Sequence, residues 1–237
     1  MHWGDAQAVL LDLDGVLTST AAVHMRAWDA MFRDCFAALG VAEPYTDADY
    51  FAHVDGRSRV DGVRAVLASR GVPLPDGDPT DPPGTATAHG WGNAKNAVVE
   101  GLFAREGVMA YPGSVAVVAD LAARGVPKAV VSSSQNALAV LAAAGYGGQF
   151  PVVVDGVVAA AERLPGKPAP DMFLRAAQRL GVDPAVAAVV EDAVSGVAAA
   201  AAGGFGLVVG VDRGAGADAL RGAGAHVVVQ DLDELLR

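Results

Sequence analysis

Two aspartates, Asp12 and Asp14, directly follow an apolar run of strand length, residues 8–11, and Gly15 comes after them. Such a run is typical of a strand that is buried on both faces of a parallel sheet. Both carboxylates then lie at the carboxyl end of that strand, where open α/β sheets bind their ligands. Neighbouring carboxylates repel each other unless a cation joins them, so the pair predicts a site for a hard metal ion such as Mg²⁺. An acidic turn at the end of a buried strand is the structural alternative.

Further polar side chains follow two later predicted strands. Ser132 ends the second strand of the predicted core, and Glu191 and Asp192 end a later one. Lys167 lies in a Gly-Lys-Pro-Ala-Pro loop before a helix. The carboxyl ends of parallel strands meet at one edge of a sheet, so these side chains are expected to converge with the aspartate pair. Several acids, a lysine and a hydroxyl in one site are the groups that phosphoryl transfer through a covalent aspartyl phosphate requires.

Each of these residues has a simpler explanation when it is taken alone. Ser132 could cap the next helix, and Lys167 could be a surface charge. Glu191 and Asp192 could favour the N-terminus of the following helix. Their conjunction at one predicted sheet edge is harder to explain without a shared role, so we interpret them as one site.

Strands and helices alternate strictly after residue 110, and this order predicts the elements that position the site. Strict alternation is typical of a parallel, doubly wound sheet. With residues 8–11 as its first strand, the predicted fold class is α/β with a Rossmann-like core. We predict core strands over 128–132, 152–154, 187–190, 207–211 and 227–229, and core helices over 114–124, 136–144, 170–180, 194–202 and 215–221.

A long insertion separates the first predicted strand from the next core helix. We assign residues 1–17 and 110–237 to an α/β catalytic core and residues 18–109 to a mainly α-helical cap domain. Residues 72–93 are rich in Pro, Gly, Asp and Thr without periodicity, and so long a structureless stretch is usually functional or mobile. Helical patterns in the cap are predicted over 20–39, 59–69 and 95–106.

Composition narrows the class of protein. The 237 residues suit one large domain or two modest ones, and 52% hydrophobic residues allow a sizeable core. A formal net charge of −10 argues against nucleic acid or an anionic membrane as the main partner, because phosphate groups favour Lys and Arg. Cys35 is the only cysteine, which excludes a disulfide within the chain. Without a signal-peptide pattern or an apolar run of membrane-spanning length, we expect a soluble, cytoplasmic protein. As to its partners, we expect a monomer.

Four motifs of the chain resemble those of the haloacid dehalogenase superfamily. They are Asp12-Leu13-Asp14-Gly15-Val16, Ser132, Lys167-Pro168 and Glu191-Asp192. The resemblance covers the whole chain, and the helical insertion is similar to the small helical cap of that superfamily. Within the superfamily the chain resembles the β-phosphoglucomutase family. The residues that carry this narrower resemblance also include Thr18, Thr20-Ala21, His24, Arg26-Ala27-Trp28, Gly56, Arg59, Lys95-Asn96, Tyr111-Pro112-Gly113 and the segment from Gly166 to Asp171.

The resemblance implies a role for each residue of the predicted core site. Asp12 would be the nucleophile that accepts the phosphoryl group, and it would also ligate Mg²⁺. Asp14 would be the general acid and base, because a sugar alkoxide needs a proton in order to leave. The backbone carbonyl of Asp14 would complete the metal site with Glu191 and Asp192. The transferring phosphoryl group would be held by Ser132, Ser133 and Lys167.

The resemblance also implies substrate contacts from the cap. Gly56 and Arg59 would engage the second, non-reacting phosphate, since a planar guanidinium meets phosphate oxygens in pairs. Gln135 stands where the family tends to carry a cation, which weakens this second phosphate site. The loop at 72–93 is longer than in compact members, so Lys95 aligns only across a gap. The other residues for which substrate binding or positioning is implied are Thr20, His24, Asn96, Ser134 and Asn136.

The predicted function is Mg²⁺-dependent phosphoryl transfer on a small phosphorylated sugar, and the resemblance implies interconversion of β-glucose 1-phosphate and glucose 6-phosphate. A phosphatase of the same fold is the alternative, because both reactions share every step up to the aspartyl phosphate. They differ in how well the cap excludes water and whether it binds both ends of the sugar. A receiver-like phospho-acceptor module is a distant alternative, but receivers have no cap-sized insertion after the first strand and need no second acid such as Asp14.

Overall fold

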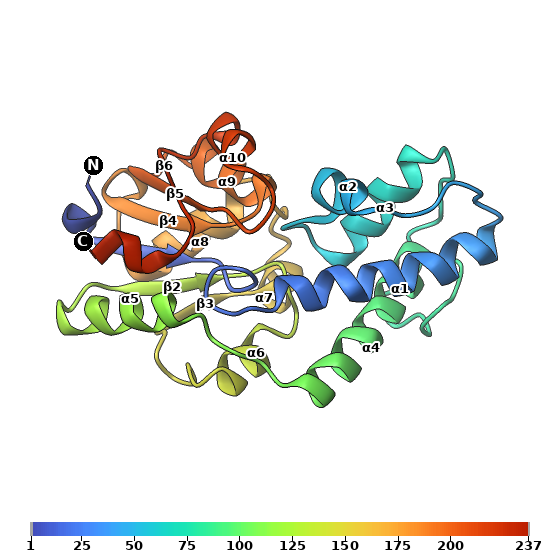
Figure 1. The fold of residues 1–237 in the computed structure, drawn as a ribbon, viewed down its shortest axis with the longest axis horizontal. Coiled ribbons are helices and arrows are strands. Elements are labelled where there is room, and N and C mark those ends of the chain that lie inside the picture. Colours follow the sequence, from blue (N-terminus) through green and yellow to red (C-terminus); the bar gives the residue numbers. More distant parts are fainter. Residues whose placement is uncertain (1, 237) are drawn as a thin grey trace. The chain divides into compact units, whose positions relative to one another are not determined.

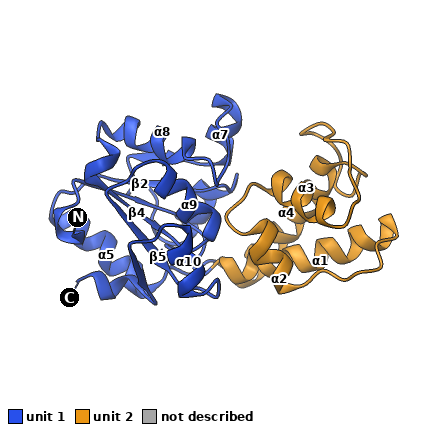
Figure 2. Ribbon diagram, turned by 90° about the horizontal axis from the view of Figure 1, so that it is seen from above, with its two compact units in different colours: residues 1–19, 108–237 blue, residues 20–107 orange. Residues whose placement is uncertain are grey.

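A computed structural model describes residues 2–236, and the chain forms two compact units. The core unit comprises Met1–Ser19 and Val108–Arg237, and the cap unit comprises Thr20–Gly107 (Figure 2). The cap unit is therefore an insertion into the core unit. The assignment of catalysis to the core and substrate selection to the cap remains a prediction.

The core unit contains, within residues 2–236, a six-stranded sheet in the order β3-β2-β1-β4-β5-β6 (Figure 1). All neighbouring strands pair in parallel. The four residues of β1 are fully buried, as expected for a strand covered on both faces. The predicted doubly wound α/β core is thus confirmed. Its strands are β1 (Ala8–Leu11), β2 (Lys128–Val131), β3 (Val152–Val154), β4 (Ala187–Glu191), β5 (Leu207–Val211) and β6 (Val227–Val229).

The register of the three central strands aligns their carboxyl ends. Leu11, the last residue of β1, pairs with the penultimate residue of both β2 and β4. Asp12 therefore follows β1 at the level of Val131 in β2 and Glu191 in β4, and Ser132 follows β2 one residue later. Asp12, Ser132 and Glu191 thus lie at one edge of the sheet.

Helices pack on the sheet through small and apolar side chains. Met172 and Phe173 are buried in the same cluster as residues of β1, β2 and β4. Helix α7 has no counterpart among the predicted elements. Asp155 caps its start, because the Asp155 side chain accepts hydrogen bonds from the backbone of Val157 and Val158 at 3.0 and 2.9 Å. The core helices are α5 (Pro112–Ala123), α6 (Ala137–Ala143), α7 (Gly156–Glu162), α8 (Asp171–Leu180), α9 (Val194–Ala202) and α10 (Ala217–Ala223).

The chain segments on either side of the insertion are bonded to each other within the core unit. The backbone nitrogen and the hydroxyl of Ser19 donate to the carbonyl of Met109 at 2.9 and 3.3 Å. The backbone nitrogen of Tyr111 donates to the carbonyl of Leu17 at 3.1 Å. These bonds fix the two ends of the insertion beside each other.

The cap unit is built around an aromatic core. Trp28 and Phe32, one helical turn apart, stack with ring centroids 5.4 Å apart, and Tyr45 stacks on Phe32 at 4.7 Å. Cys35 is fully buried, and burial raises the pKa of its thiol to about 12, so the side chain serves as an unreactive packing residue. The cap helices are α1 (Ala21–Leu39), α2 (Asp47–Asp49), α3 (Arg59–Ser69) and α4 (Ala88–Glu106), with a π-helical turn over Tyr50–Val54.

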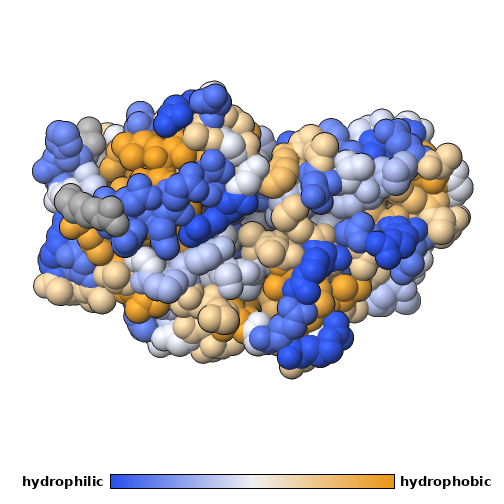
Figure 3. All heavy atoms as spheres, viewed as in Figure 1, coloured by the Kyte–Doolittle hydropathy of each residue, from blue (hydrophilic) through white to orange (hydrophobic). Residues whose placement is uncertain are grey.

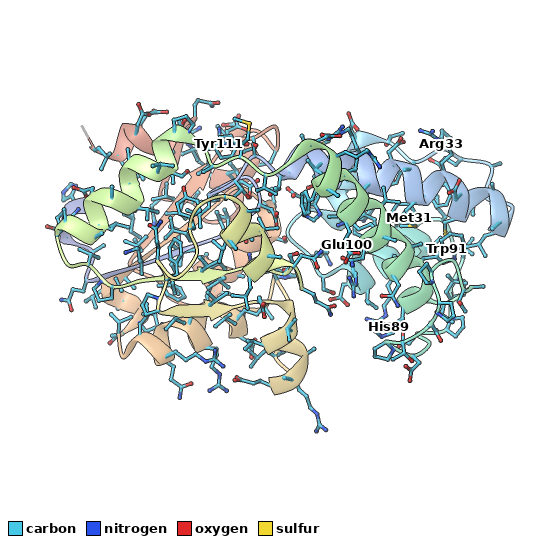
Figure 4. All side chains as sticks on the ribbon, turned by 90° about the horizontal axis from the view of Figure 1, so that it is seen from below. Met31, Arg33, His89, Trp91, Glu100 and Tyr111 are labelled. Carbon is cyan, nitrogen blue, oxygen red and sulfur yellow. The ribbon has the colours of Figure 1, made fainter. Side chains whose placement is uncertain are left out.

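Helix α4 begins earlier than predicted, at Ala88 and not at residue 95. The hydroxyl of Thr87 accepts a hydrogen bond from the backbone of Gly90 at 2.9 Å and caps the helix. Gly90 and Gly92 weaken the helical pattern of the sequence in the first turns of α4. Glycine is nevertheless required at position 90, because an added Cβ would overlap the backbone of Thr85. Trp91 is buried in the same cluster as Met31 and packs in the core of the cap unit (Figure 4).

The surface combines hydrophilic and hydrophobic residues on the face that Figure 3 shows. Every helix in residues 2–236 falls short of the length and apolar character that a bilayer crossing requires.

The cap of α4 predicts a measurable loss of stability. Thr87→Ala removes the acceptor for Gly90 and should lower the free energy of unfolding in urea by about 1 kcal/mol. Thr87→Ser keeps the hydroxyl and serves as the matched control. Equal unfolding midpoints for the two variants would show that the hydroxyl does not stabilise the helix.

Candidate active site

A buried lysine connects the carboxylates at the carboxyl edge of the sheet. Lys167 Nζ donates to Asp12 Oδ1 at 2.6 Å and to Glu191 Oε1 at 2.5 Å, and it also contacts the carbonyl of Val131 at 3.2 Å. The side chains of Lys167 and Glu191 are fully buried, and that of Asp12 is 9% exposed. The Lys167–Pro168 peptide bond is cis. The lysine thus comes from the loop before α8 and ends between β1 and β4.

Burial sets the protonation behaviour of this network. Burial raises the pKa of Asp12 well above its usual value; Lys167 opposes the shift, while Glu191 and Asp14 add to it. Burial alone would lower the pKa of Lys167, but Asp12 and Glu191 outweigh it and raise that pKa. The two carboxylates thus favour the ammonium form of Lys167, while burial disfavours the carboxylate form of Asp12.

Asp12, Glu191 and Asp192 form the candidate metal centre. Their carboxylate oxygens lie within 4.8 Å of one another, and all three residues are buried. Three carboxylates against the single ammonium of Lys167 give this cluster a net charge of −2 when all four groups are ionised. A hard divalent cation with oxygen ligands would balance that charge, so the residues fit a metal such as the one predicted.

Two glycines allow the acidic side chains to approach the backbone closely. Gly15 has a φ of +90°, and an added Cβ would overlap Asp192 Oδ2. Gly196, in the first turn of α9, faces Glu191 so closely that an added Cβ would overlap Oε1. The other oxygen of Glu191 accepts from the backbone of Ala193 at 3.0 Å. Glu191 is thus held by the start of α9 as well as by Lys167.

The loop after β2 turns through hydrogen bonds of its own serines. Ser132 is buried, and its hydroxyl accepts from the backbone of Ser134 at 3.1 Å. The hydroxyl of Ser134 accepts in turn from the backbone of Asn136 at 3.1 Å. The carbonyl of Ser134 accepts from the backbone of Gly156 at 3.0 Å. Residues 132–136 are therefore ordered by their own polar groups and by the start of α7.

The cap unit contains six residues for which the sequence implies substrate binding or positioning. Two of them, His24 and Lys95, are in contact. Lys95 Nζ lies 2.6 Å from His24 Nδ1 and 4.9 Å from the centroid of the Trp28 ring. Asn96 Nδ2 donates to Glu100 Oε1 at 2.7 Å. Glu100 is labelled in Figure 4 on helix α4. The other three are Thr20 before α1, Gly56 in a turn with a φ of +73°, and Arg59 at the start of α3.

Sequence reasoning overlooked two residues that shape the site. Gly196 lies inside the helix predicted over 194–202, and a glycine there costs about 1 kcal/mol relative to alanine, which signals a packing requirement. Arg213 gave no signal, because its contact with Gly15 at 2.9 Å joins segments 198 residues apart.

The close approach at Gly196 predicts a defect in the acidic cluster. Gly196→Ala should displace Glu191 and raise the concentration of divalent metal ion that half-saturates turnover by about tenfold or more. Gly222→Ala in α10 is the matched control, because an added Cβ there meets nothing within 4 Å. Equal dependence of the two variants on divalent metal ion would contradict the placement of Glu191 in the candidate metal centre.

Comparison with known proteins agrees with this geometry. The sequence matches the haloacid dehalogenase-like hydrolases over residues 6–204. It is 48% identical to a β-phosphoglucomutase of Mycobacterium bovis, over 97% of this chain and 91% of that protein. It is 30% identical to a β-phosphoglucomutase of Bacillus subtilis, over 88% of this chain and 84% of that one. The crystal structure of a β-phosphoglucomutase from Clostridium difficile has the same fold, with a TM-score of 0.77 at 24% identity over 97% of this chain and 93% of that one. This chain belongs to the haloacid dehalogenase-like hydrolases and, among them, to the β-phosphoglucomutase family.

Proposed function

We propose that this protein is a Mg²⁺-dependent phosphotransferase that interconverts β-glucose 1-phosphate and glucose 6-phosphate. The buried Asp12 carboxylate supports this proposal most directly, because it lies 2.6 Å from Lys167 and beside the other two acids of the cluster. That arrangement suits an aspartate that accepts a phosphoryl group. The 48% identity to a β-phosphoglucomutase over nearly the whole chain supports the choice of sugar.

Asp12 acts as the nucleophile. One carboxylate oxygen forms a bond to phosphorus while the bond between phosphorus and the sugar oxygen breaks. The backbone of Asp12 is held for this step, since its nitrogen donates to the carbonyl of Val190 at 2.9 Å. A divalent cation held by Asp12, Glu191, Asp192 and the carbonyl of Asp14 would offset the negative charge of the phosphoryl oxygens.

Lys167 and the serines hold the moving group. The fixed ammonium of Lys167 lies beside Asp12 and balances the charge that the phosphoryl oxygens bring to it. Ser132 and Ser133 follow β2 at the same sheet edge and donate from the hydroxyl and the backbone. These groups are in place before the substrate arrives, so little reorganisation is needed during transfer.

Asp14 acts as the general acid and then as the general base. It gives a proton to the departing sugar oxygen and later removes one from the hydroxyl that attacks the phosphorylated Asp12. The positive φ of Gly15 turns the chain immediately after Asp14, and the backbone of Gly15 bonds to the carbonyl of Thr18 at 2.8 Å. The proposed acid therefore stands directly before a tight turn, and its charge acts on Asp12, whose pKa it helps to raise.

The cap binds the part of the sugar that does not react. Arg59 is the proposed partner of the second phosphate, with Gly56, Ser134 and Asn136. Burial lowers the pKa of Arg59 and Glu100 opposes that shift, yet an arginine stays charged at neutral pH. Thr20, His24, Lys95 and Asn96 complete the proposed substrate-binding set.

A sugar-phosphate phosphatase is the second candidate. Gln135 favours it, because a neutral side chain at this position of the loop after β2 gives a second phosphate less positive charge. Water would then take the phosphoryl group from Asp12.

A coupled assay separates the two candidates. With β-glucose 1-phosphate, a glucose bisphosphate primer and Mg²⁺, the protein should form glucose 6-phosphate with little free phosphate. Asp12→Asn removes the nucleophile and should abolish the reaction. Free phosphate as the sole product would favour the phosphatase, and activity retained in Asp12→Asn would refute the aspartyl-phosphate mechanism.

The role of Asp14 predicts a selective defect. Asp14→Asn should lower kcat for β-glucose 1-phosphate by about 100-fold or more and change KM little, because the proton matters most in the transition state. Steady-state kinetics on the variant measure both. A raised KM with an unchanged kcat would mean that Asp14 binds substrate and does not transfer a proton.

A further inference from the structure

We infer that Arg213 is a positioning residue for Asp14, an inference that rests on the proposed function. Its Nε donates to the carbonyl of Gly15 at 2.9 Å, and Gly15 is the residue directly after Asp14. Its Nη1 donates to the carbonyl of Gln230 at 2.8 Å. The side chain is 19% exposed, so these bonds are largely shielded from water. The guanidinium thus bonds the turn after β1 to the chain that follows β6.

The guanidinium also packs on the segment that returns from the insertion. Its central carbon lies 3.8 Å from the centroid of the Tyr111 ring, which is a close cation–π contact. Tyr111 precedes α5, and its backbone is bonded to Leu17. Arg213 therefore joins the turn that carries Asp14 to the segment by which the chain re-enters the core.

The base of Arg213 is itself fixed. Asp212 Oδ1 accepts from the backbone of Gly214 at 3.0 Å and of Gly216 at 3.1 Å. These bonds lower the pKa of Asp212, with the bond from Gly214 as the largest cause. Arg213 accordingly projects from a hydrogen-bonded loop at the end of β5.

The backbone on both sides of Asp14 is held by side-chain donors. The carbonyl of Leu13 accepts from the hydroxyl of Thr18 at 3.1 Å, and the carbonyl of Val16 accepts from the buried hydroxyl of Ser114 at 2.6 Å. The carbonyl of Gly15 accepts a hydrogen bond from Arg213. On the other side, an added Cβ at Gly15 would overlap the side chain of Asp192. Loss of the Arg213 bond would let the Gly15 peptide rotate, and the direction of the Asp14 side chain would change with it.

This role has a chemical signature that a purely structural role lacks. Asp14 is needed when the leaving group is a sugar alkoxide, because that oxygen must be protonated. A nitrophenolate leaves readily without a proton, so p-nitrophenyl phosphate tests transfer to Asp12 without help from Asp14. Displacement of Asp14 should therefore slow the reaction of a sugar phosphate much more than that of p-nitrophenyl phosphate.

The experiment compares Arg213→Gln, Arg213→Lys and Asp14→Asn with both substrates. Arg213→Gln should lower kcat for β-glucose 1-phosphate by about tenfold or more, with less than about a threefold loss on p-nitrophenyl phosphate. Arg213→Lys keeps the charge but not the planar fork, so it should show the same selectivity in weaker form. Arg221→Gln is the matched control, because Arg221 is 58% exposed and pairs with Asp218 on the same helix. Thermal unfolding of each variant checks that the chain is folded.

Each outcome decides the inference. Equal losses on the two substrates, or no loss in either Arg213 variant, overturn the role of Arg213 if Asp14→Asn itself is selective. If Asp14→Asn shows no selectivity, the proposed acid role of Asp14 fails, and the inference fails with it. If the wild type does not turn over β-glucose 1-phosphate, the proposed mutase reaction fails. The loss of kcat in each variant is then compared between glucose 6-phosphate, another alkyl phosphate, and p-nitrophenyl phosphate.

Discussion

The ammonium of Lys167 between Asp12 and Glu191 is the interaction on which this site depends. Burial of several carboxylates side by side is strongly unfavourable unless opposite charge and hydrogen bonds compensate it. Lys167 supplies part of that charge from within the fold, and the backbone at the start of α9 supplies a further donor to Glu191. The negative charge that remains uncompensated is the property that would attract a metal ion. The fold therefore tolerates an electrostatic cost at the place where the chemistry is proposed to occur.

Close contacts of the backbone extend this constraint to the neighbouring turns. Gly15 and Gly196 lie against Asp192 and Glu191, and neither position leaves space for a Cβ. The backbone at Gly15 and Gly196 therefore limits how far the side chains of Asp192 and Glu191 can move. Their spacing is thus a consequence of strand register and of two glycines, and a bound cation would enter a site that is already formed.

The core could be predicted from the sequence further than the cap. Strand ends determine where Asp12 and Glu191 emerge, and a parallel sheet aligns those ends, so their proximity follows from local patterns. The start of α4 could not be predicted, because Gly90 and Gly92 obscure a helix that tertiary packing around Trp91 stabilises. Arg213 could not be predicted either, since nothing local to an arginine after a strand reveals which distant carbonyl it will contact. The roles of the site residues remain predictions that kinetics must test.

The bonds between Ser19 and Met109 have a consequence for how such proteins diversify. Because the two ends of the 88-residue cap unit, Thr20–Gly107, meet at neighbouring backbone positions, the sheet does not depend on what is inserted between them. A longer, shorter or differently folded segment could occupy this point without altering strand order or the acidic cluster. Under the proposed roles, substrate preference would change by exchange of one contiguous stretch of gene, while the reaction proposed at Asp12 would be inherited intact.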